Sequence, residues 1–152
     1  MSPKYKKYNQ SDPLQLIVVG LFRLLWWIAT LPFKGLVRGK KKGLSLNDRN
    51  YLASKRQEIE RLTGSQSEIE LKHAVMEADK LVDYAFKAKG FAGETFADRL
   101  RSAQSSLNPA LYNELWQGHK VRNQIAHEQG VSFSDRELKE AVTKLLMYLR
   151  AL

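Results

Sequence analysis

One short string in the last third of the chain holds residue types suited to proton transfer and phosphate binding. Arg122 is followed directly by Asn123, and His127 comes after three further residues. Arginine is a permanently charged, fork-shaped donor that suits phosphate oxygens, and histidine titrates near neutral pH and can move protons. These groups suffice for metal-free RNA cleavage, in which the 2′-hydroxyl attacks the adjacent phosphate. We therefore take Arg122, Asn123 and His127 as candidate catalytic residues, with Asn123 holding the phosphate or orienting the other two.

Helix geometry limits what one copy of this string can do. On a regular helix Arg122 and His127 point about 140° apart, so one chain does not aim both at the same point. A purely structural interpretation also stays open. In it, Arg122 bonds an acid across the fold, Asn123 satisfies a helix end, and His127 caps carbonyls near a helix C-terminus.

The other histidines and the absence of cysteine argue against a metal site. His73 has no evident ligand partner and is expected to be structural. His119 and His127 share a helical face, but eight residues correspond to about 12 Å of rise, too far to bind one metal ion together. The chain has no cysteine, which excludes disulfides and thiolate sites. We expect no metal and no cofactor.

Helical periodicity dominates residues 47–152, with no sustained strand alternation. We expect helices at about 47–63, 65–89, 94–106 and 108–128, and a last one from 134. Ser65 with Glu68, and Ser134 with Glu137, have capping-box spacing. Asn108 before Pro109 gives a further cap. The pattern predicts an all-α fold, an up-and-down bundle of four to five helices preceded by a separate N-terminal apolar helix.

Apolar residues at helical spacing give the expected core of this bundle. The first helix has a sparse stripe and the second a continuous one. In chain order the expected inward positions are Tyr51, Leu52, Ile59, Leu62, Ile69, Leu71, Ala74, Val75, Ala78, Leu81, Val82, Ala85, Phe86, Phe96, Leu100, Ala103, Leu138, Val142, Leu145, Leu146 and Leu149.

The string and the helix order together resemble the HEPN superfamily. Its hallmark is an arginine, four to six residues and a histidine, often with a polar residue after the arginine, near the end of the penultimate helix of a small bundle. Arg122, Asn123 and His127 match this pattern, and the resemblance covers residues 47–152. It implies a metal-independent endoribonuclease that acts as a homodimer, with the motifs of two protomers in one cleft. Many similar domains are non-catalytic, so an interaction or dimerisation module is the alternative.

The basic excess of the chain lies almost entirely at its N-terminal end. Residues 1–43 hold nine Lys or Arg against one acid, whereas residues 44–152 hold sixteen against fifteen. The bundle therefore offers no charge argument for broad nucleic-acid binding. Positive clusters beside an apolar run are instead typical of a membrane edge.

Residues 14–33 form that apolar run, which is long enough to cross a hydrocarbon core of about 30 Å as a helix. Arg23 near its midpoint costs about 2.5–3.5 kcal/mol on insertion scales, so a tilted or interfacial helix is the alternative to a full span. A cleaved signal peptide and a buried core helix fit less well. We expect residues 14–33 to bind the lipid bilayer, with the Lys40, Lys41 and Lys42 cluster contacting head groups.

The domain organisation follows from these segments. Residues 1–13 are a basic tail, 14–33 a membrane-associated or transmembrane helix, 34–46 a basic linker and 47–152 the HEPN-like bundle. More basic residues follow the apolar run than precede it, which favours the bundle on the cytoplasmic side. The expected function is a membrane-anchored ribonuclease with an RNA substrate, such as a toxin–antitoxin or defence effector. The alternatives are a membrane-anchored interaction module and a lipid-surface protein that binds electrostatically.

Overall fold

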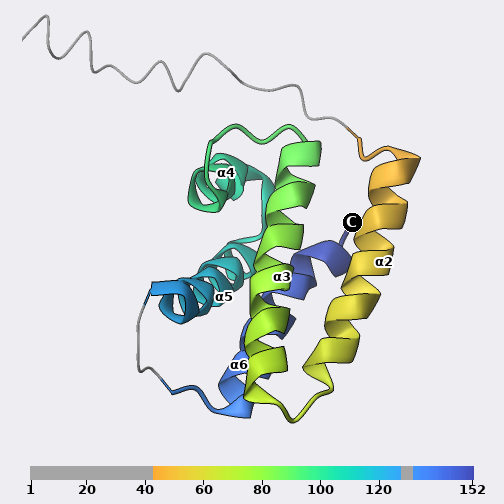
Figure 1. Ribbon diagram of the computed structural model, residues 1–152. Coiled ribbons are helices and arrows are strands. Elements are labelled where there is room, and N and C mark those ends of the chain that lie inside the picture. Colours follow the sequence, from red (N-terminus) through yellow and green to blue (C-terminus); the bar gives the residue numbers. More distant parts are fainter. Residues whose placement is uncertain (1–42, 128–131) are drawn as a thin grey trace, which may run out of the picture. The chain divides into compact units, whose positions relative to one another are not determined.

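A computed structural model describes residues 43–127 and 132–152 of the chain. Within these ranges the backbone forms five α-helices and one short 3₁₀ turn, with no strand (Figure 1). The helices are α2 (Leu46–Thr63), α3 (Glu68–Ala88), α4 (Phe96–Ala103), α5 (Pro109–His127) and α6 (Asp135–Arg150), and the 3₁₀ turn η2 is Gln104–Ser106. The expected all-α bundle is therefore confirmed for the described part.

Local capping explains where most of these helices begin. Ser134 and Glu137 form the expected capping box at α6, each side chain accepting the other residue's backbone N–H. The side chain of Asn108 accepts the backbone N–H of Ala110 at 2.8 Å and so supports the start of α5. Capping boxes also start α2, at Ser45, and α4, at Thr95.

Two predicted helix starts were wrong. Ser65 and Glu68 do not form a capping box, because α3 begins at Glu68 with Ser67 as its N-cap residue. The Ser65 hydroxyl instead accepts the backbone N–H of Ser67 at 2.9 Å, within the turn between α2 and α3. The third helix begins at Phe96 rather than Glu94, because Thr95 and Asp98 supply its capping box.

Contacts between helix ends set the relative directions of α3 and α6. Lys72, near the start of α3, lies over the ring of Phe133, just before α6. Phe86, near the end of α3, packs on Tyr148, near the end of α6, with ring centroids 4.7 Å apart. The two helices thus run in the same direction, and α2 lies beside α3 after a short turn (Figure 1).

The core lies where α3 meets α2, α5 and α6. Of the expected core, all positions are buried except two, since Ile69 is 81% exposed and Tyr51 is 43% exposed. The prediction for Ile69 is wrong because Ile69 lies on the side of α3 opposite the buried positions Leu71 and Ala78, at about 100° of rotation per residue. Tyr51 instead packs against the ring of Tyr84 at 4.8 Å on the surface between α2 and α3.

The membrane expectation falls on residues outside the described ranges. The tail 1–13, the apolar run 14–33, the lysine cluster at 40–42 and most of the linker are not described. None of the helices within 43–127 and 132–152 combines the length and apolar character needed to span a bilayer.

Close contact between α5 and α6 depends on Gly118. A methyl group added there would lie 2.6 Å from Cγ of Leu145 and 3.2 Å from the carbonyl oxygen of Ala141. Leu145 is fully buried and cannot swing away. Gly118→Ala should therefore lower the free energy of unfolding by about 1–3 kcal/mol, despite a helix-propensity gain of about 1 kcal/mol. Urea unfolding measures this, with Gly43→Ala as control because nothing lies within 4 Å of that position. Equal stability of the two variants would contradict the packing argument.

The capping box of α6 gives the fold one source of pH dependence. Hydrogen bonds from the Ser134 hydroxyl and backbone N–H hold the pKa of Glu137 below its ordinary value of 4.5. A lowered carboxylate pKa stabilises the fold at pH values above 4.5 and loses that contribution as the pH falls. Glu137→Gln should accordingly lose less thermal stability than the wild type on acidification. If the melting temperatures of the two proteins fell in parallel as the pH was lowered below 4.5, the capping box would contribute nothing to the pH dependence of stability.

Candidate active site

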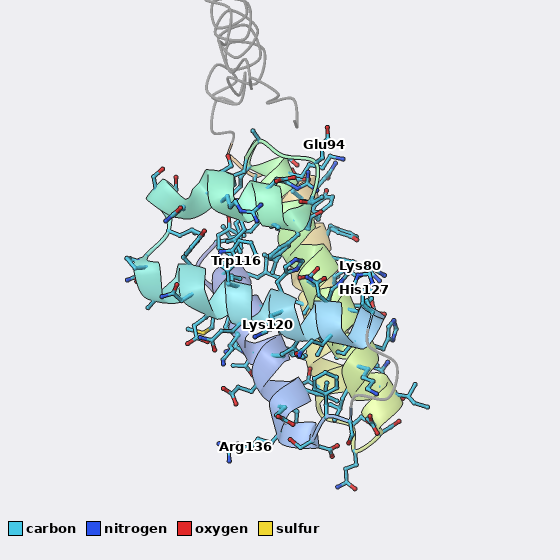
Figure 2. The ribbon with its side chains drawn as sticks, turned by 90° about the vertical axis from the view of Figure 1, so that its left-hand side faces the viewer. Lys80, Glu94, Trp116, Lys120, His127 and Arg136 are labelled. Carbon is cyan, nitrogen blue, oxygen red and sulfur yellow. The ribbon has the colours of Figure 1, made fainter. Side chains whose placement is uncertain are left out.

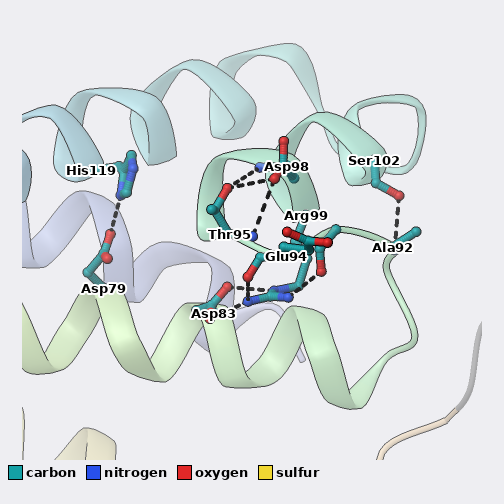
Figure 3. Close-up of polar contacts among 10 residues, drawn as sticks. Asp79, Asp83, Ala92, Glu94, Thr95, Asp98, Arg99, Ser102 and His119 are labelled. Carbon is teal, nitrogen blue, oxygen red and sulfur yellow. Dashed lines mark hydrogen bonds and ion pairs between the residues drawn. The ribbon is translucent and has the colours of Figure 1, made fainter. Parts of the chain in front are cut away.

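A buried carboxylate and imidazole pair links α3 to α5. Asp79 is 4% exposed and His119 is 8% exposed, and Nδ1 of His119 lies 2.7 Å from Oδ1 of Asp79 (Figure 3). Both side chains project into the region between the helices because they occupy the inward faces that also carry the apolar core. Burial of charged groups is costly unless they are paired, so this contact is a strongly specified feature of the fold.

The pair continues through two of the predicted site residues. Nδ2 of Asn123 lies 3.1 Å from Nε2 of His119, one turn along α5. Oδ1 of Asn123 accepts a hydrogen bond from Nη1 of Arg122 at 3.0 Å. Nε of Arg122 lies 3.5 Å from Oδ2 of Asp79, so the chain of contacts leads back to the carboxylate where it began. Asp79, His119, Asn123 and Arg122 form one polar network, here called the α3–α5 network.

Helix α4 covers one side of this network. Arg99 donates two hydrogen bonds to the Asp83 carboxylate of α3, at 2.7 and 2.8 Å, and others to the carbonyl oxygens of Gly93 and Glu94 (Figure 3). The bonds to Asp83 raise the pKa of Arg99. This clamp fixes the start of α4, where the ring of Phe96 stacks on that of His119 at 4.3 Å.

His127 lies apart from the network, in the last turn of α5. It is exposed, and among the described residues no hydrogen bond or ion pair of its ring is found. Figure 2 shows Trp116, Lys120 and His127 following one another along α5. These three residues, together with Gln117, His119, Asn123 and Gln124, line a hollow on this face of the helix.

The face of α5 therefore presents two kinds of group. Asn123 belongs both to the hollow and to the α3–α5 network, whereas Arg122 belongs to the network and keeps 27% of its side chain exposed. Arg122 faces Asp79 of α3, whereas His127 is exposed and lines the hollow. A single chain offers a positioned arginine and amide and, separately, an accessible imidazole.

Comparison of the chain with protein-family models, with curated protein sequences and with solved structures found no match. The site must therefore be interpreted from its own residues. Within residues 43–127 and 132–152 no group of three or more His, Asp or Glu side chains is placed to hold a metal ion.

Two members of the α3–α5 network and one surface pair were not predicted from the sequence. The sequence signal for Asp79 is an acid among the apolar positions Val75, Ala78 and Val82 of one helix face, which the motif does not include. For His119, spacing along the sequence suggests His127 as the neighbour, whereas its partner in the fold is Asp79. His73 does have an acidic neighbour, because its Nε2 lies 3.7 Å from Oε1 of Glu77 on the surface of α3.

Proposed function

We propose that this protein is a membrane-anchored, HEPN-like endoribonuclease that cleaves RNA without a metal ion and acts as a homodimer. The observation that carries the proposal is the contrast between a preorganised Arg122–Asn123 pair and an accessible His127 on the same helix. Preorganised donors stabilise developing charge most effectively, and a general acid or base must be free to reach the proton it moves.

Each residue has a defined part in this reaction. His127 takes the proton of the 2′-hydroxyl as it attacks the adjacent phosphorus, or gives a proton to the leaving 5′-oxygen. The Arg122 guanidinium stabilises the negative charge that builds on the phosphate oxygens, and the Asn123 amide donates to the same group or holds Arg122. The products are a 2′,3′-cyclic phosphate and a 5′-hydroxyl.

A dimer supplies what one protomer lacks. Because Arg122 and His127 face different directions on α5, a reacting phosphate contacts both only if they come from two chains. A two-fold axis near the exposed face of α5 brings His127 of one protomer toward Arg122 of its partner, since such an interface places the same patch of both subunits together.

Incubation of the purified full chain with RNA in the presence of EDTA tests this proposal. We expect cleavage that leaves 2′,3′-cyclic phosphate ends, which mild acid opens to a monophosphate that a phosphatase then removes, whereas a 3′-hydroxyl end is changed by neither treatment. Absence of cleavage, a strict need for divalent cations, or 3′-hydroxyl products would each overturn it.

One observation favours a non-catalytic dimerisation module as the second candidate. Arg122 already bonds Asn123 and faces Asp79 within its own chain, so its charge is partly neutralised before any phosphate arrives. In that case the protein forms stable dimers, as shown by light scattering after size exclusion, but leaves RNA intact under all conditions.

Membrane attachment is a separate part of the proposal and rests on the sequence of residues 14–33. The full chain should stay on phosphatidylcholine vesicles at high salt, because apolar insertion is not screened by ions. Release by salt, with binding only to phosphatidylserine-containing vesicles, would show that the lysine cluster alone attaches the protein.

A further inference from the structure

The hydrogen-bond partners of the α3–α5 network determine the state of every group in it. The Asp79 carboxylate only accepts hydrogen bonds, so Nδ1 of His119 must carry a proton. The Arg122 guanidinium only donates, so the Asn123 atom that faces it must be the oxygen. The Asn123 amide nitrogen therefore faces His119 and donates to Nε2, which carries no proton. Asp79 and Arg122 therefore determine the tautomer of His119 and the orientation of the Asn123 amide between them.

This arrangement sets the direction of the Asn123 amide. An Nε2 that carried a proton would need an acceptor, and the amide would turn its oxygen toward His119. Its NH₂ group would then face the guanidinium of Arg122, donor against donor, and the contact at 3.0 Å would be lost. The imidazole of His119, held by Asp79 on one side and by the stacked ring of Phe96 on its face, thus decides whether Asn123 can accept the hydrogen bond from Arg122, which adds to the ion pair of Arg122 with Asp79.

We propose that His119 is the positioning residue of the site. It acts on Arg122 through Asn123, and Asp79 fixes the tautomer in which His119 does so. His119 touches no substrate in this role. For its effect on catalysis the inference rests on the proposed ribonuclease function, but the positioning itself is a property of the folded chain.

Two substitutions of His119 differ in which hydrogen bonds of the network they keep. His119→Gln keeps one donor for Asp79 and one acceptor for Asn123, so it should preserve the link. His119→Phe keeps a ring that stacks on Phe96 but offers neither hydrogen bond. His73→Phe, on the exposed face of α3, is the matched control for the loss of a histidine.

Nitrogen-15 NMR of the full chain tests the positioning without any activity. In the wild type we expect the Nδ1-protonated tautomer of His119 and separate, slowly rotating Nη resonances of Arg122. His119→Phe should merge the Arg122 resonances, and His119→Gln should retain them. An Nε2-protonated His119 in the wild type, which needs no variant to fold, would overturn the inference, as would Arg122 resonances unchanged in His119→Phe.

Kinetic measurements separate the positioning role of His119 from the proposed ribonuclease function. His119→Phe should lower kcat about 100-fold with little change in KM, the size expected for a misplaced catalytic group, and His119→Gln should recover most of the loss. An NMR result as expected in a protein that never cleaves RNA supports the positioning and rejects only the ribonuclease. Cleavage that survives in His119→Phe at the wild-type rate rejects the positioning and leaves the ribonuclease standing.

Discussion

His127→Ala is expected to lower the rate of RNA cleavage by about 10²–10⁴-fold, the usual contribution of a general acid or base. The side chain is exposed in the last turn of α5 and has no hydrogen bond to another described residue, so its loss should not disturb the fold. The effect should therefore appear in kcat at unchanged melting temperature. Initial rates on a labelled RNA oligonucleotide measure it.

His73→Ala is the matched control for that variant. His73 is also exposed on a helix, where its Nε2 lies 3.7 Å from Oε1 of Glu77. The His73→Ala variant should cleave RNA at the wild-type rate. If His127→Ala also retained the wild-type rate, His127 would have no part in the chemistry.

Arg122→Ala is expected to lower kcat by about 10²–10³-fold, the typical cost of removing one preorganised donor from a developing negative charge. Unlike His127→Ala, it should also affect the fold, because it removes the donor to Asn123 Oδ1 and one of the two cationic or polar groups that face the Asp79 carboxylate among the described residues. Stability and rate must therefore be measured on the same preparations.

Arg122→Lys separates the two effects. Lysine keeps the positive charge near Asp79 but lacks the planar fork that bonds Asn123 and a phosphate together. We expect a folded protein of near wild-type stability whose cleavage rate is still strongly reduced. A lysine variant with the full wild-type rate would show that only charge matters at this position, and the hydrogen bond to Asn123 would then have no catalytic value.

The sequence was sufficient for several features that depend on local physics, although not for the capping box predicted at Ser65 and Glu68. The capping box of Ser134 and Glu137, the cap at Asn108 and the long apolar stripe of α3 all come from residues a few positions apart. The predicted start of α4 at Glu94 differs from the observed start at Phe96, where Thr95 and Asp98 form the capping box. The carbonyl oxygen of Glu94 instead accepts a hydrogen bond from Arg99.

The site was only half predictable because its organisation is tertiary. Arg122, Asn123 and His127 are close in sequence and could be selected by type and spacing. The contact of His119 with Asp79 joins residues 40 positions apart, and it depends on how α5 packs across α3. Periodicity places Asp79 on an apolar face but does not name its partner.

The shared cleft is the central claim, and a heterodimer of Arg122→Ala with His127→Ala tests it most directly. Co-expression of the two full-length variants with different affinity tags allows the mixed dimer to be isolated by successive purification. If each site takes Arg122 from one chain and His127 from the other, one of its two sites is intact, and it should cleave RNA at roughly half the wild-type rate although both parents are nearly inactive. A mixed dimer as inactive as its parents, or a protein that forms no dimer at all, would contradict the account.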